Sequence, residues 1–197
     1  MSRHLRFFSK RLSAQMKEVS LMFSFPFRKK ARKKPSKEGV NLLASILVCY
    51  EEITRVSYEP KDDTIRLTFS IEEPVTKARF DKLGKLLAES VAAFLNLSGI
   101  RARVVSLEME TAGAISFLHL IRDVESLTRD ELSLVADILY DAFPETLLLD
   151  ERDPLDPNFE VEQENLLDHM LGAVRQHRLK EKLLGIREGD RVVVYNQ

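Results

Sequence analysis

The side chains best suited to chemistry are one cysteine and four histidines, and their spacing limits what they can do. A metal ion needs ligands that converge within about 2.0–2.3 Å of it. His169 and His177 fall on one predicted helix but are eight residues apart in the sequence, which separates them by ~12 Å along the axis. Asp150, Asp153 and Asp156 lack the alternate spacing and central glycine of a calcium loop. The sequence therefore predicts no metal site.

Catalysis by a side-chain nucleophile would need a base beside it, and His119 is the best candidate for such a base. It lies in the apolar stretch SFLHLIRD, where a buried histidine with one hydrogen bond is the usual explanation. A pocket assembled around His119 from distant residues is the alternative. Cys49 lies in SILVCYEE and is expected to be a small core residue. We predict no catalytic residue.

Glycine-rich nucleotide loops are missing from the sequence. The chain has seven glycines, and none of them forms G-x-G-x-x-G or G-x-x-x-x-G-K-[ST]. The first of these motifs marks a dinucleotide-binding turn, and the second marks a loop that cradles phosphates. We therefore expect no cofactor.

Charge is distributed unevenly along the chain. Residues 1–37 contain 12 Lys and Arg and a single acid, Glu18, whereas the whole chain holds 30 basic and 31 acidic residues. Residues 38–197 therefore keep 18 basic and 30 acidic residues. A basic arm on an acidic body indicates contact with an anionic surface, which is either a membrane or a nucleic acid.

The first part of the arm has the pattern of an amphipathic helix. If residues 3–23 turn by about 100° per residue, one side of the helix gathers Leu5, Phe8, Leu12, Met16, Val19 and Phe23. Such a basic helix is typical of a membrane surface, a calmodulin-like groove or an organelle presequence. Pro26 ends the helix, and the like-charged run beyond it is expected to be disordered. Met22 is an alternative start of translation that would remove the helix.

The predicted attachment site combines six cations with three aromatic rings. Its residues are Arg28, Lys29, Lys30, Arg32, Lys33, Lys34, Phe23, Phe25 and Phe27. The cations would bind an anionic surface, and the rings would bury apolar area in a bilayer. The rings favour a membrane, while phosphates of a nucleic acid or a ribosome are the alternative.

Residues 38–197 are expected to form one acidic α+β domain with a mainly antiparallel sheet and helices packed on it. The stretch IRLTFSI, residues 65–71, alternates apolar and polar side chains as a half-buried strand does. It pairs with ITRVSY at residues 53–58. A second predicted hairpin joins residues 100–110 to 114–121, and each hairpin is followed by a helix. The prediction is two ββα-like units, then a C-terminal helix and hairpin.

Helix boundaries carry local signals. Thr76 and Thr128 are predicted N-caps, and Gly99 marks a helix end. Thr128 and Glu131 have the spacing of a capping box, in which each side chain would bond the backbone N–H of the other residue. Residues 40–50, VNLLASILVCY, are predicted to form a buried helix.

We interpret the chain as a non-enzymatic interaction or adaptor protein. No apolar run approaches the roughly 20 residues that span a bilayer, so we expect a cytoplasmic protein or one peripheral to a membrane. The arm would attach to an anionic surface, with a membrane favoured, and the body would bind a protein partner or a second copy of itself. A nucleic-acid- or ribosome-associated protein and a small enzyme around His119 remain the alternatives.

Overall fold

The structure is a computed structural model that describes residues 34–150, 157–188 and 191–197. These belong to one compact unit, Lys33–Gln197. Its helices are α2 (Lys37–Cys49), α3 (Lys77–Leu97), α4 (Arg129–Ala142) and α5 (Pro157–Gln176). Its strands are β1 (Ile53–Glu59), β2 (Thr64–Ile71), β3 (Val105–Ala112), β4 (Ile115–Asp123), β5 (Leu183–Glu188) and β6 (Arg191–Asn196). The α+β prediction is confirmed.

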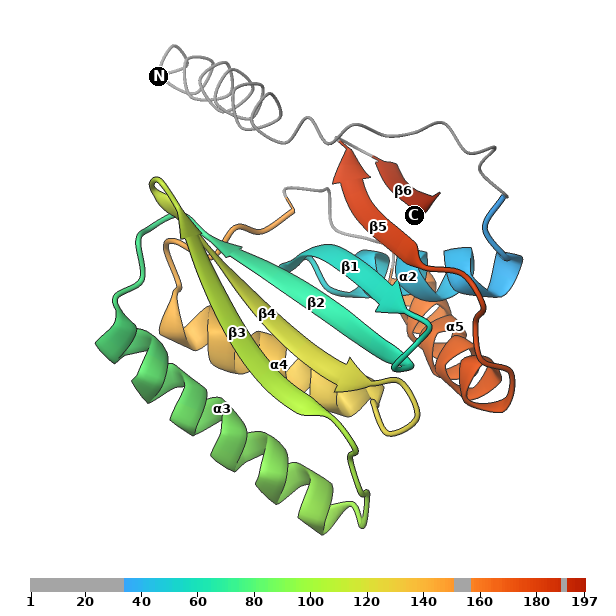
Figure 1. The fold of residues 1–197 in the computed structure, drawn as a ribbon, viewed down its shortest axis with the longest axis horizontal. Helices are drawn as coiled ribbons and strands as arrows, with labels where there is room; N and C mark the ends of the chain where they lie inside the picture. The colour runs from blue at the N-terminus through green and yellow to red at the C-terminus, as the bar shows by residue number, and fades with distance from the viewer. Residues whose placement is uncertain (1–33, 151–156, 189–190) are drawn as a thin grey trace. The chain divides into compact units, whose positions relative to one another are not determined.

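The six strands form one sheet in the order β3-β4-β2-β1-β5-β6, and every neighbouring pair is antiparallel (Figure 1). Strands that follow each other in the chain form three hairpins, β1–β2, β3–β4 and β5–β6. Pairing between β2 and β4 and between β1 and β5 joins the hairpins into a continuous sheet. The predicted antiparallel sheet is therefore present.

The sheet has two chemically different faces. Leu67 of β2 lies opposite Val56 of β1 and Leu120 of β4, and these three side chains are at most 3% exposed. Because successive residues of a strand point to opposite faces, the next pair, Thr68 and His119, lies on the other face. We call the face with Leu67 the helix face and the face with Thr68 the open face.

All the described helices that contact the sheet do so on the helix face. Gly185 of β5 allows α2 to approach closely, because a Cβ atom there would lie 3.2 Å from Leu43. Gly84 of α3 lies against Leu107, which is on the helix face opposite Leu120. Helix α4 reaches the same face through a buried ion pair that is described below, and α5 packs on α2 and α4. Figure 1 shows α2, α4 and α5 behind the sheet.

Helix caps follow the predictions at three places. Thr76 Oγ1 accepts a hydrogen bond from the Arg79 backbone N–H at 3.3 Å, and Thr128 Oγ1 accepts one from Glu131 at 3.2 Å. Gly99 follows α3 with a φ of +67°, a conformation that glycine adopts without strain. Only half of the predicted capping box forms, because the carboxylate of Glu131 is used elsewhere.

The second hairpin differs from its predicted limits. Strand β3 covers Val105–Ala112 and not residues 100–110. The backbone N–H groups of Arg103 and Val104 donate to Asp123 Oδ1 at 2.9 and 2.7 Å. The Asp123 side chain therefore takes the N–H groups of both residues, and only the Val104 oxygen still bonds the backbone of β4, at its last residue.

None of the helices in the described ranges is both long and apolar enough to cross a membrane.

Candidate functional site

The centre of the open face carries a polar cluster around His119. Thr68 Oγ1 lies 3.0 Å from His119 Nδ1, and Glu110 Oε1 lies 3.6 Å from His119 Nε2. Beside them Arg66 forms a 2.9 Å ion pair with Glu108. Burial and then the charge of Arg66 hold the pKa of His119 below its usual value, against the opposing effect of Glu110. The imidazole is therefore neutral near neutral pH.

The order hydroxyl, imidazole and carboxylate resembles the arrangement that activates a nucleophile. An attacking oxygen must be accessible to its substrate, however, and the Thr68 residue is only 3% exposed. His119 itself is 9% exposed. The sequence interpretation of His119 as a buried histidine with one hydrogen bond matches this geometry, although the residue lies on the polar face of the sheet. This geometry supplies hydrogen bonds within the sheet and no reachable nucleophile.

A polar hollow of about 510 Å³ lies at the end of the open face near the β1–β2 turn. Its charged lining residues are Arg66, Arg103, Lys182, Glu59, Asp62 and Glu108. Each cation has a partner within the hollow: Lys182 binds Glu59 at 2.9 Å, and Arg103 donates to the backbone oxygen of Asp62 at 2.6 Å. The hydrogen bond from Lys182 lowers the pKa of Glu59. Lys182 and Arg66 are therefore paired with carboxylates, whereas Arg103 bonds a neutral backbone oxygen.

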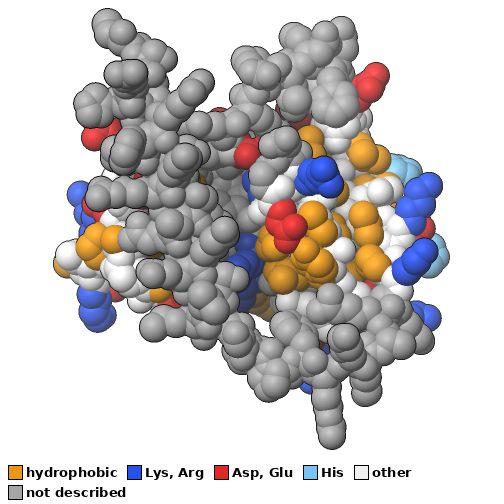
Figure 2. All heavy atoms as spheres, turned by 90° about the horizontal axis from the view of Figure 1, so that it is seen from above, with side chains coloured by type: hydrophobic (Ala, Val, Ile, Leu, Met, Phe, Trp, Pro, Cys, Tyr) orange, Lys and Arg blue, Asp and Glu red, His pale blue; other side chains and the backbone are white. Residues whose placement is uncertain are grey.

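Apolar side chains occupy other parts of the open face. Strand pairing places five apolar side chains on the same side as Thr68 and His119. These half-buried side chains are Phe117, Ile121, Leu184, Ile186 and Val193. Figure 2, which views the molecule from above, shows hydrophobic side chains gathered over part of the described surface with acidic and basic side chains among them. Protein-binding surfaces combine an apolar core with a polar rim, so this face is a candidate for such a surface.

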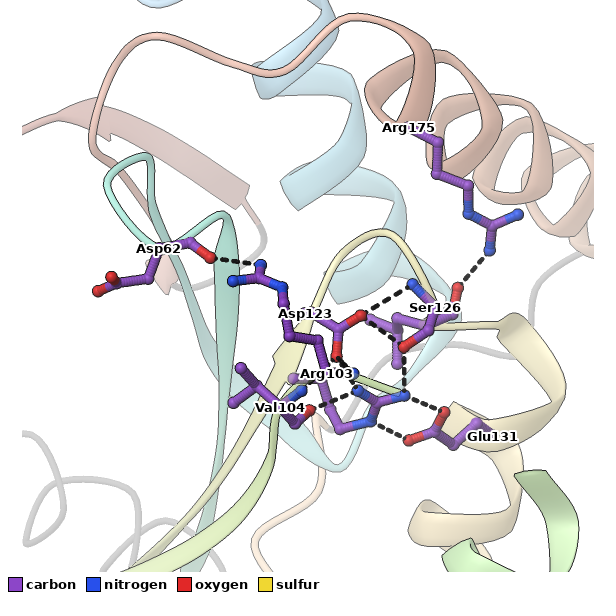
Figure 3. A network of polar contacts seen from close by, with 9 residues as sticks. Asp62, Arg103, Val104, Asp123, Ser126, Glu131 and Arg175 are labelled. Carbon is purple, nitrogen blue, oxygen red and sulfur yellow. Dashed lines mark hydrogen bonds and ion pairs between the residues drawn. The ribbon is translucent and has the colours of Figure 1, made fainter. Parts of the chain in front are cut away.

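On the helix face, Arg122 is the centre of a buried polar network, and Figure 3 labels its partners Val104, Asp123, Ser126 and Glu131. Its side chain is fully buried and binds both oxygens of Glu131, at 2.5 and 2.9 Å. It also donates to Asp123 at 2.8 Å, to the backbone oxygen of Val104 at 2.6 Å and to Ser126 at 3.1 Å. A guanidinium has five N–H donors, so all of them are used. The network ties β4 to β3 and to the start of α4.

The two carboxylates of the network share Arg122 but differ in their other surroundings. Burial opposes ionisation of Asp123, but hydrogen bonds from Ser126 and from the Val104 backbone, together with Arg122, hold its pKa below the usual value. Glu131 lies in the first turn of α4, where the helix dipole favours a negative charge. Burial of a charged cluster is tolerated only with such complete pairing. We assign this network to the stability of the fold.

The structure describes only one residue of the predicted attachment site. Lys34 is exposed, whereas the other five cations and the three phenylalanines lie outside the described residues. The predicted boundary between the arm, residues 1–37, and the body, residues 38–197, also remains a prediction.

The remaining candidates fall at separate places. His169 and His177 are exposed, and Cys49 is half-buried against the core. Asp150 forms a 2.6 Å ion pair with Arg187, while Asp153 and Asp156 lie outside the described ranges. Across the described part of the chain, no three His, Cys, Asp or Glu side chains are placed to hold one metal ion.

The Arg122 network was not predicted from the sequence. A signal for the network exists, since Arg122 and Asp123 stand at the end of an apolar strand, where charged residues need partners. Nothing local identifies Glu131 as that partner. Comparison with family models, with curated proteins and with solved structures finds no match to this chain.

Proposed function

We propose that this protein is a non-enzymatic adaptor that attaches to an anionic surface through its N-terminal arm and binds a protein partner through its body. A membrane is the favoured surface. The proposal rests on the open face: half-buried apolar side chains and two ion pairs lie together there, and the described helices that contact the sheet pack on the opposite side. Antiparallel sheets often leave one face to solvent, so the apolar content of this face is what favours a partner.

The charge division supports the attachment half of the proposal. Residues 1–37 carry 12 basic residues and one acid, and each cation near an anionic bilayer contributes about 1 kcal/mol at low salt. The three phenylalanines add apolar area, about 1.5–3 kcal/mol for each ring that is fully buried. An arm that binds phosphates alone would gain little from the rings.

Co-sedimentation of the full-length protein with vesicles tests the attachment. Replacement of Arg28, Lys29, Lys30, Arg32, Lys33 and Lys34 with Gln should release the protein from vesicles that contain phosphatidylserine. Replacement of Phe23, Phe25 and Phe27 with Ser should also weaken binding strongly. Full vesicle binding by the six-Gln protein would contradict the mechanism. If the Ser protein keeps vesicle binding together with salt-sensitive RNA binding, the nucleic-acid alternative is favoured.

Two open-face variants and one control variant test the binding of a partner. Ile121→Asp and Ile186→Asp place charges on the open face, and both residues are half-buried there. Val161→Asp on α5 changes a residue that is 57% exposed and lies away from the sheet. A cross-linked partner that is lost with both open-face variants and kept with Val161→Asp would support the proposal. Equal capture by all three variants would exclude this face as the binding surface.

A further inference from the structure

Strand β3 is the outermost strand at one end of the sheet, so one of its edges has no partner strand among the described residues. It pairs with β4 without a bulge through eight consecutive residues. The Asp123 N–H donates to the Val104 oxygen at 3.3 Å. Because the direction of backbone groups alternates along an antiparallel strand, the groups that point away from β4 are those of Val105, Leu107, Met109 and Thr111.

The side chains of the same residues lie on the helix face and are incompletely covered. Leu107 and Met109 are half-buried, whereas their cross-strand neighbours Leu120 and Leu118 are 3% and 0% exposed. Val105 is 47% exposed. The difference follows from position, because the inner residues have strands on both sides. A further strand beyond β3 would cover these apolar side chains.

Helix α3 provides a surface beneath the place that a further strand beyond β3 would occupy. Figure 1 shows α3 running alongside β3, and Gly84 of α3 lies against Leu107, since a Cβ atom there would lie 3.6 Å from its Cδ2 atom. One and two turns further along α3, Ala88 and Ala92 are exposed. These small residues leave room for the side chains of a strand that extends the sheet over the helix.

The open-face side of β3 is acidic. Glu108 and Glu110 have side chains that are 52% and 72% exposed. On the inner side they meet Arg66 and His119, and on the outer side they would meet alternate residues of an added strand. A second copy of β3 that paired antiparallel about Met109 would place Glu108 opposite Glu110, which destabilises a sheet. Basic residues at alternate positions would pair with them.

We propose that the outer edge of β3 accepts an extended segment of a partner protein as a seventh strand, in which lysine or arginine alternates with apolar residues. Main-chain hydrogen bonds to Val105, Leu107, Met109 and Thr111 would hold the segment, as in other cases of strand addition. Glu108 and Glu110 would favour a segment with basic residues, because these residues would pair with the two carboxylates. This inference goes beyond the proposed function, because it needs neither the arm nor the centre of the open face to bind anything.

Amide hydrogen exchange in the full-length protein tests the proposal, with a synthetic nonapeptide of alternating lysine and valine as the probe. We expect the peptide to slow exchange at Leu107 and Met109, whose N–H groups point outward. The amides of Glu108 and Glu110 already bond β4 and should change little. A peptide in which glutamate replaces lysine should give no protection at β3. Equal protection by both peptides, or protection by neither, would overturn the proposal.

Two sets of variants locate the contact. Met109→Pro removes an outward N–H, which an edge strand tolerates, and should abolish the protection, while Met109→Val should keep it. If Met109→Pro fails to fold, the double variant Glu108→Lys/Glu110→Lys preserves the backbone and should exchange the preference from the lysine peptide to the glutamate peptide. An unchanged preference contradicts the assignment. Ile186→Asp on the far side of the sheet should leave peptide binding intact, which separates this test from that of the open face.

Discussion

At the scale of single residues, the feature that most constrains the fold is Arg122. Its five donors are satisfied inside the protein, and Glu131 and Asp123 supply the compensating charge. Sequence alone indicates that an arginine at the end of an apolar strand needs a partner. It does not identify Glu131, because the same residue also fits a capping box with Thr128. The part of the capping-box prediction in which the Glu131 side chain bonds the Thr128 N–H was wrong, because this carboxylate binds Arg122.

Arg122→Met should be strongly destabilising. The change leaves Asp123 and Glu131 buried without their cation, and the removal of one member of a buried ion pair typically costs about 3–5 kcal/mol. Urea unfolding of the full-length protein at neutral pH measures this loss. Arg66→Met is the matched control, because its ion pair with Glu108 is 40% and 52% exposed and should contribute at most about 1 kcal/mol. Similar losses for the two variants would contradict the role assigned to Arg122.

His119 should make stability depend on pH. Its pKa in the folded protein is lowered by burial and by Arg66, relative to about 6.5 in the unfolded chain. As pH falls below that value, the unfolded chain binds the proton first, so the free energy of unfolding decreases until the folded-state pKa is passed. Stability curves at a series of pH values should show this decrease in the native protein and lose it in His119→Gln. His177→Gln changes an exposed histidine and should keep the decrease. If this variant, and not His119→Gln, removes the decrease, the assignment to His119 is wrong.

At the scale of elements, prediction succeeded where the signals are local. The alternation of Ile65, Leu67, Phe69 and Ile71 identified β2, and all four side chains are 0% exposed. Thr76, Thr128 and Gly99 marked helix ends because capping and left-handed conformations involve only a few neighbouring residues. The limits of β3 were missed because Asp123, which is distant in sequence, captures the backbone of Arg103 and Val104.

Helix α4 allows a direct comparison of cap and core. Leu132 is 1% exposed, and core Leu→Ala changes cost about 2–5 kcal/mol. Loss of the Thr128 cap should cost only ~1 kcal/mol. Thermal or urea unfolding should therefore rank Leu132→Ala as the more harmful change. The reverse order would mean that Leu132 does not anchor this helix in the core.

At the scale of the whole molecule, hairpins were predictable but their order in the sheet was not. Spacing identifies β1–β2, β3–β4 and β5–β6, because each pair is close in sequence. The pairing of β1 with β5 joins residues more than 120 positions apart, and no local pattern selects it over other arrangements. The open face results from that order together with the packing of the helices, so the candidate binding surface could not be derived from the sequence. The charge division between residues 1–37 and the rest was visible from composition alone.

We propose that the arm holds the anionic surface while the open face of the body stays available to a partner. Hydroxyl-radical footprinting of the protein on phosphatidylserine vesicles, compared with the free protein, tests both parts in one measurement. We predict that Phe23, Phe25 and Phe27 become protected on the vesicles, whereas Phe117 and Ile121 react as they do in the free protein. Protection of Phe117 and Ile121 with unchanged reactivity of the three arm phenylalanines would contradict the account, because the body would then be the lipid-binding part.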